Sequence, residues 1–178
     1  MKILKKIALA ILGIIAVVLV FALFIDKEFS LTKEVTINKS KQQVFDYAKL
    51  IRNQEQYSVW VMADPNINIS YTGTDGTTGF TSAWVSEDKN VGVGEQEIIE
   101  LQEGERMKVE IRFKKPFEGT NYAVTTFTAV GDNQTKVTSE FSGKSAYPMN
   151  IMNLFMNSFV GNDMQANLNN MKRNLETK

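Results

Sequence analysis

The longest apolar run of the chain lies near its amino end, where residues 7–25 read IALAILGIIAVVLVFALFI without a charged side chain. As an α-helix this run would be about 28 Å long, which matches a hydrocarbon core of about 30 Å. It is apolar on every face, whereas a helix that packs on a core has one apolar stripe. It is also longer than the apolar region of a signal peptide, about 7–15 residues, and no small-x-small cleavage site follows it. We therefore expect an uncleaved membrane-spanning helix, with a cleaved signal peptide as the alternative.

Beyond this run, apolar and polar residues alternate in several short segments. The clearest is RMKVEIRF, residues 106–113, in which every second side chain is charged. This pattern indicates an antiparallel strand with one face on a core and one in water. Turn signals such as GTDGTTG, EDKNVG and GDNQ separate segments of the same kind. They predict further strands at residues 29–38, 67–72, 79–86, 95–101, 121–130 and 135–143.

A helical pattern follows the first predicted strand. The sequence SKQQ forms a capping box, with Ser40 at the N-cap and Gln43 three residues later. A second short helical turn is expected at residues 53–57.

The chain ends in a segment expected to be one long helix from Pro148 onward, because proline suits a first helical position. Two apolar stripes fall on this helix, rotated by about 120° from one another. The first consists of Met152, Phe155, Met156 and Phe159, and the second of Met164, Leu168, Met171 and Leu175. Gly161 lies between them, which predicts a kink or a change of packing partner there.

The order of strand, short helices, six strands and long helix predicts an α+β fold, with a long amphipathic helix on one face of a curved antiparallel sheet of six to seven strands. We expect two parts: an anchor at residues 1–26 and one folded domain at residues 27–178.

Composition limits the chemistry available to this domain. The chain has no cysteine and no histidine, so disulfides, thiolate metal sites and the commonest general base are excluded. We expect no catalytic residue, no cofactor site and no metal site, and the balance of the sequence favours a protein that is not an enzyme.

Charge bears on location and partners. Lys2, Lys5 and Lys6 precede the apolar run, and no acidic residue occurs before Asp26. Since positive flanks stay on the cytoplasmic side, we expect a single-pass protein with a cytoplasmic amino terminus and an extracytoplasmic domain. The chain lacks a basic stripe with interleaved aromatic residues, so no nucleic-acid binding is expected, and the sequence names no protein partner.

Four segments of the domain resemble a known family. They are VTINKSKQQVFDYAKLIRNQEQYSVW, GTDGTTGFTSAW, NVGVGEQEI and GNDMQANLNNMK. Residues 29–176 are similar to the START-like, or SRPBCC, helix-grip superfamily in its polyketide cyclase/dehydrase-like branch. The resemblance implies a curved sheet wrapped on a long C-terminal helix, with a cavity between them for lipids, sterols, polyketides or other apolar ligands. A minority of the family are enzymes.

Candidate pocket residues follow from this resemblance and from side-chain chemistry, because methionine adapts to varied apolar partners and aromatic residues supply large apolar area with a polar handle. The alternative for each is ordinary core packing. The candidates are Tyr57, Trp60, Trp84, Phe113, Met152, Phe155, Met156 and Phe159.

The leading hypothesis is a membrane-anchored domain that binds a hydrophobic small molecule or lipid between the sheet and the C-terminal helix. The alternatives are a polyketide cyclase- or hydrolase-like enzyme using carboxylate or tyrosine acid–base chemistry, and a partner-binding module without a ligand.

Overall fold

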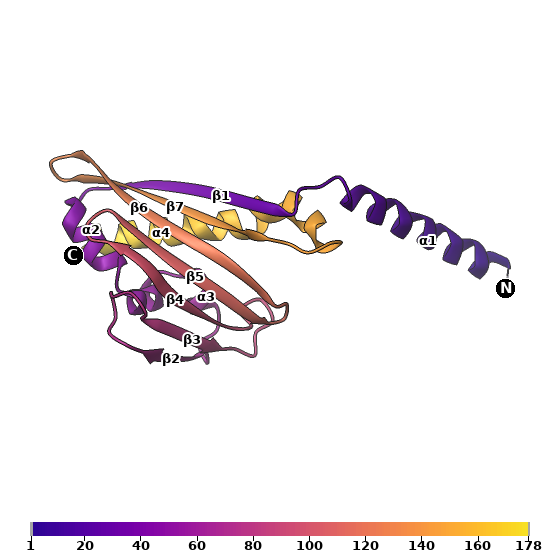
Figure 1. Ribbon diagram of the computed structural model, residues 1–178, viewed down its shortest axis with the longest axis horizontal. Coiled ribbons are helices and arrows are strands. Elements are labelled where there is room, and N and C mark those ends of the chain that lie inside the picture. The colour runs from indigo at the N-terminus through magenta and orange to yellow at the C-terminus, as the bar shows by residue number, and fades with distance from the viewer. Residues whose placement is uncertain (1, 178) are drawn as a thin grey trace.

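The computed structural model describes residues 2–177, which form one extended helix and one folded domain (Figure 1). Helix α1 (Lys2–Ala22) projects away from the domain, and only Ala22 on it is buried. Among the described residues, α1 is the one helix long and apolar enough to cross a membrane. The apolar run predicted to be helical is therefore helical and remains unpacked.

The domain is built on a single antiparallel sheet in the order β1-β7-β6-β5-β4-β3-β2. From β2 to β7, each strand pairs with the next one along the chain, and β1 joins the sheet beside β7. The strands are β1 (Glu28–Ile37), β2 (Asn68–Thr72), β3 (Thr81–Val85), β4 (Val93–Gln102), β5 (Arg106–Lys115), β6 (Gly119–Gly131) and β7 (Gln134–Lys144). All seven predicted strands are present, with boundaries within two residues of those expected.

The two faces of β5 differ as its alternation predicted. Met107 and Val109 are buried on the inner face. On the outer face, the Arg112 guanidinium pairs with Glu95 at 2.8 Å and with Glu97 at 2.9 Å. These partners lie on the neighbouring strand β4, so the outer surface of the sheet is a polar ladder that faces water.

Short helices connect β1 to β2. Helix α2 (Lys41–Ala48) begins with the predicted capping box, in which Ser40 accepts from the Gln43 backbone and the Gln43 side chain accepts from the Ser40 backbone. The 3₁₀ turn η1 (Ile51–Gln56) follows, close to the short turn expected there. Helix α3 (Val59–Ala63) was not anticipated, because five residues are too few to show a helical period.

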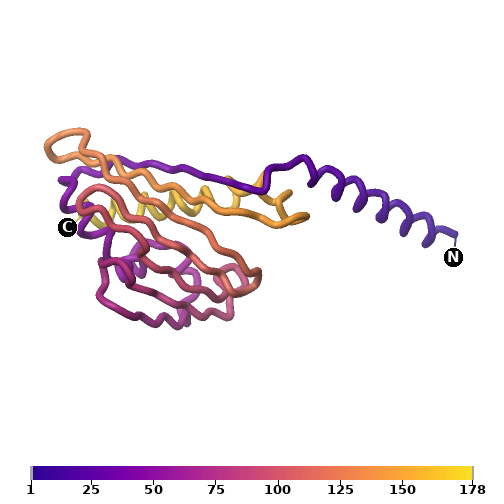
Figure 2. Tube along the Cα trace, in the orientation of Figure 1, coloured from indigo at the N-terminus to yellow at the C-terminus, as the bar shows by residue number. Residues whose placement is uncertain are grey.

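The C-terminal segment is not the single α-helix expected from Pro148. It consists of the 3₁₀ turn η2 (Met149–Phe155), the π-helical turn η3 (Asn157–Gly161) and helix α4 (Asn162–Glu176). Figure 2 shows this irregular trace between the end of β7 and α4. The predicted change at Gly161 corresponds to the end of the π turn, where an added Cβ would lie 3.1 Å from the Lys33 side chain of β1.

Helix α4 packs against β1, α3 and η1 through the second predicted stripe. Its members Met164, Leu168, Met171 and Leu175 are all buried. Two hydrophobic clusters form the core. One joins α4 and α2 to β1, β6 and β7, and includes Phe45, Phe127 and Val137. The other joins Ile51 of η1 and Phe80, which directly precedes β3, to Ile98 of β4 and to Met107 and Val109 of β5.

Candidate ligand-binding cavity

A cavity of about 360 Å³ lies between α4 and the inner face of the sheet, with residues of both hydrophobic clusters among its walls. Strands β2 to β7 supply one side, and α4, α3 and η1 supply the other. Its volume falls within the range of about 300–1,000 Å³ typical of small-molecule sites. The curvature of the sheet therefore leaves unfilled space beside a core that is otherwise packed.

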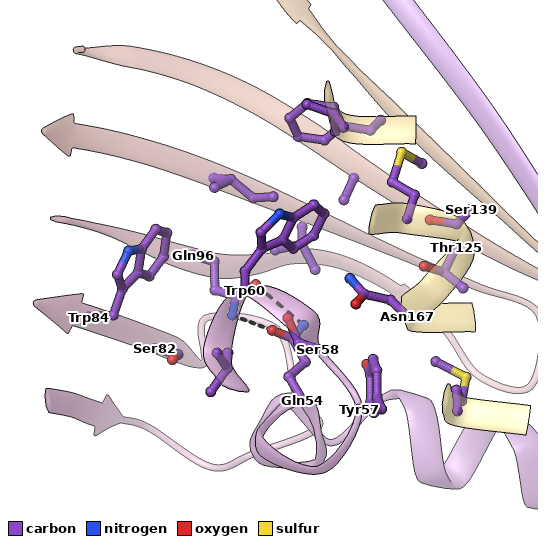
Figure 3. A pocket seen from close by; sticks show the side chains of 18 of the residues that line it. Gln54, Tyr57, Ser58, Trp60, Ser82, Trp84, Gln96, Thr125, Ser139 and Asn167 are labelled. Atoms are coloured by element: carbon purple, nitrogen blue, oxygen red, sulfur yellow. Dashed lines mark hydrogen bonds between the residues drawn. The ribbon is translucent and has the colours of Figure 1, made fainter. Parts of the chain in front are cut away.

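Aromatic side chains form part of the wall (Figure 3). The Trp84 ring packs edge-on against Phe113 with centroids 5.9 Å apart, and its Nε1 donates to the Val91 carbonyl at 3.3 Å. Trp60 is partly exposed on α3, and its Nε1 donates to Asp163 at the start of α4, at 3.0 Å. Both indoles are thus held by polar contacts at their edges, and both contribute apolar ring surface to the cavity wall.

The structure brings together four of the eight candidate residues. Tyr57, Trp60, Trp84 and Phe113 all line the cavity. Whether they contact a ligand stays a prediction.

The other four candidates lie outside the cavity lining. Met152, Phe155 and Phe159 are exposed by 39%, 50% and 58%, and Met156 is half-buried. Met152 and Phe155 lie on η2, Phe159 lies on η3, and Met156 lies between these two turns. Side chains on 3₁₀ and π turns do not repeat at 100° per residue, so the four residues do not share the face that an α-helix would give them. The C-terminal segment lines the cavity instead through Val160, Met164, Asn167, Leu168 and Met171.

Polar side chains that the sequence did not single out also reach the cavity. Gln96 on β4 donates from Nε2 to the Gln54 Oε1 at 2.8 Å, which places a pair of amides in the wall. Asn167 on α4 accepts from the Val59 backbone at 2.7 Å. Ser82, Thr125 and Ser139 are further polar lining residues. Strand alternation explains such inward positions once the register is known. Ser82, for example, stands two residues before Trp84 on β3 and therefore lies on the same face of the sheet.

Tyr57 is the only titratable residue among the lining residues that the structure describes. Its burial raises the pKa of the phenol above its ordinary value, so the hydroxyl stays protonated and neutral at physiological pH. The cavity wall is consequently uncharged. The described chain also contains no group of acidic residues arranged to hold a metal ion.

Comparison with known proteins places this geometry in context. A family model described as polyketide cyclase / dehydrase and lipid transport matches residues 28–176. No curated protein matches the chain.

Solved structures share the fold at low sequence identity. Norcoclaurine synthase from Thalictrum flavum, in complex with dopamine and hydroxybenzaldehyde, aligns over 85% of this chain and 88% of that chain, with 11% identity and a TM-score of 0.65. A protein from Arthrobacter aurescens aligns over 84% and 87%, with 13% identity and a TM-score of 0.61. An uncharacterised protein from Rhizobium leguminosarum aligns over 85% and 96%, with 14% identity and a TM-score of 0.56.

Proposed function

Because the chain belongs to the polyketide cyclase / dehydrase and lipid transport family, we propose that it is a membrane-anchored domain that binds a hydrophobic small molecule or lipid between the sheet and α4. The observation that carries this proposal is the cavity of about 360 Å³ with an uncharged, mainly apolar wall. Each Å² of apolar ligand surface removed from water there would contribute about 25 cal/mol to binding.

The wall also limits the kind of ligand. A charged group buried among these side chains would lack a counter-ion, which is strongly unfavourable. The ligand is therefore neutral within the cavity, or it keeps a charged end at the exposed lining residues Trp60 and Asn90. The Gln54–Gln96 amide pair offers a donor and an acceptor to a carbonyl or hydroxyl of the ligand.

The proposed anchor is α1. Its length, its apolar composition and its unpacked side chains support a transmembrane position. The three lysines at its amino end support a cytoplasmic amino terminus. A tether of this kind would hold the cavity close to a supply of lipophilic molecules.

The proposal is tested by purifying the full chain in lipid nanodiscs, followed by native mass spectrometry and extraction of bound molecules. A fluorescent acyl ligand then reports binding directly, since the two tryptophans of the chain, Trp60 and Trp84, both line the cavity and can transfer energy to it. We expect a co-purified apolar molecule and saturable energy transfer.

Two matched variants sharpen this experiment. Ala123→Phe places a ring in the cavity wall and should abolish both the co-purified molecule and the energy transfer. Ala83→Phe is the control, because Ala83 lies between the lining residues Ser82 and Trp84 on β3 and is not itself a lining residue. Equal binding by both variants would contradict the proposal.

A second candidate function rests on Tyr57. Its buried phenol stays protonated, so it can donate a hydrogen bond to a ligand oxygen and stabilise negative charge that develops there during a reaction. Tyr57→Phe separates the two functions. Loss of turnover of a captured ligand with unchanged affinity would identify an enzyme, whereas unchanged behaviour supports binding alone.

A further inference from the structure

One end of the sheet adjoins α1, and we call it the proximal end. It is the end at which β1 begins, and Glu28 of β1 pairs there with Lys144 at the end of β7. The start of β6 and the end of β5 also lie at the proximal end, because the strands are antiparallel and Gly119 at the start of β6 pairs with Phe113 near the end of β5. The β5–β6 connection and the segment after β7 therefore both lie at the proximal end, on the side of the domain from which α1 leaves (Figure 1).

Large apolar side chains are exposed at this end. Phe117 in the β5–β6 connection is 70% exposed. Leu154, Phe155 and Phe159 on the segment after β7 are also at least half exposed. At the opposite end of the sheet lies the β6–β7 hairpin. Among its described residues, Val130 is the exposed large apolar one. The exposed hydrophobic surface of the domain is thus concentrated where the anchor enters.

Hydrogen bonds fix the segment 147–159 to the end of the anchor. The buried Asn150 donates from Nδ2 to the carbonyls of Ala22 at 2.7 Å and Ile25 at 2.8 Å. Asn153 donates to the Asp26 carbonyl at 2.9 Å, and the Tyr147 hydroxyl donates to the Leu19 carbonyl at 3.3 Å. The exposed apolar residues of segment 147–159 are consequently held close to the end of α1.

These contacts indicate what covers the exposed apolar residues of the proximal end. If α1 spans a bilayer, residues bonded to its last turn lie at the boundary between acyl chains and headgroups. Tyrosine and tryptophan are enriched at that depth, and apolar faces that carry phenylalanine and leucine insert about 5–10 Å into the boundary. We propose that Phe117 and segment 147–159 dock on the surface of the bilayer that holds α1. This inference rests on the anchored arrangement in the proposed function.

Docking would place the cavity beside the membrane. Asn90, an exposed lining residue, lies in the β3–β4 connection, which is also at the proximal end because Val85 of β3 pairs with Val93 of β4. Val160 belongs to the cavity lining and directly follows Phe159 of the docking segment. The ligand class favoured by this arrangement is an amphiphile that resides in the membrane and enters the cavity from it.

The absence of cysteine from the chain makes this docking directly testable. Phe155→Cys and Phe117→Cys are labelled with an environment-sensitive NBD fluorophore in the full chain, reconstituted in vesicles of neutral phospholipid. Val130→Cys is the matched control, since it is an exposed apolar residue at the far end. A lipid that carries a nitroxide at the headgroup end of its acyl chain is the quencher.

We expect blue-shifted emission and several-fold stronger quenching at positions 155 and 117 than at position 130. Equal quenching at all three positions would overturn the docking. A blue shift that rises with protein density but resists the lipid quencher would also overturn it, because it identifies a second copy of the chain as the covering partner.

A fourth label separates this inference from the proposed anchor. Leu12→Cys lies near the middle of α1, where the side chain is exposed. Quenching at position 12 by a nitroxide near the end of the acyl chain, without quenching at positions 155 and 117, would overturn the docking and leave the anchor intact. No quenching at position 12 would overturn the anchor itself and, with it, the docking.

Discussion

Two leucines of the C-terminal segment show how position decides the role of a side chain. Leu168 on α4 is 3% exposed and belongs to the cluster that joins α4 to the sheet. Leu154 on η2 is 57% exposed and lies on the proposed docking surface. Methionine divides in the same way, since Met164 and Met171 are buried whereas Met149 and Met152 are exposed.

This difference predicts unequal costs of truncation. Leu168→Ala should lower the free energy of unfolding by about 2–5 kcal/mol, because it removes buried methyl groups from a packed core. Leu154→Ala should change it by less than about 0.5 kcal/mol, as is usual at exposed positions. Urea unfolding of the full chain in nanodiscs, followed by the fluorescence of Trp60 and Trp84, measures both. Similar losses in the two variants would show that η2 is part of the core.

At the scale of elements, the contact between β3 and β4 shapes the cavity wall. Gly94 of β4 pairs with Trp84 of β3. A Cβ on Gly94 would lie 2.5 Å from Cζ2 of Trp84 and 2.8 Å from the Arg112 carbonyl of β5. The indole can therefore lie along the sheet only because this residue has no side chain.

Gly94→Ala should displace the Trp84 ring, lower the free energy of unfolding by about 1–3 kcal/mol through overpacking, and weaken binding of the fluorescent acyl ligand. Gly119→Ala is the matched control, because nothing lies within 4 Å of its added Cβ. Tryptophan emission and ligand titration report the two effects. Unchanged emission and affinity in Gly94→Ala would mean that Trp84 does not depend on this contact.

The segment between β7 and α4 is the element that differs most from expectation. Asn150 and Asn153 of this segment donate to the carbonyls of Ala22, Ile25 and Asp26, at the end of α1 and in the linker after it, and the bond from Asn150 to Ala22 spans 128 residues of sequence. The backbone of this segment runs through 3₁₀ and π geometry before α4 begins. The methionines and phenylalanines of η2, Met156 and η3 are thereby directed away from the cavity lining.

At the scale of the whole molecule, α1 leaves the domain at the proximal end of the sheet (Figure 1), and the exposed apolar residues of the β5–β6 connection and of the segment after β7 lie at that same end. If α1 is the proposed anchor, this arrangement would suit uptake of the proposed ligand from the membrane.

The anchored arrangement predicts that the full chain keeps its amino terminus and stays in the membrane pellet after alkaline carbonate extraction. Protease added outside cells stripped of their wall should digest residues 27–178, because the lysines keep the amino terminus in the cytoplasm and the domain then lies outside. A soluble species that begins near Phe29 would identify a cleaved signal instead. Protection of the domain from the protease would reverse the topology.

The sequence by itself determined the features that depend on neighbouring residues. The uninterrupted apolar run predicted α1, the pair Ser40 and Gln43 predicted the start of α2, and alternation predicted the strands. The second apolar stripe, from Met164 to Leu175, predicted the buried face of α4. Each of these signals is local, because a helix or strand repeats its own period along the chain.

Only the tertiary structure decided what fills and what surrounds the cavity. Gln54, Gln96 and Asn167 are far apart in sequence, and they share a cavity because the curved sheet brings β4 opposite η1 and α4. The same holds for the first stripe, which lies in 3₁₀ and π geometry on a segment bonded to the end of α1 and to the linker after it. Contacts over such separations leave no periodic trace in the sequence, so composition marked the methionine-rich segment but not the direction in which it faces.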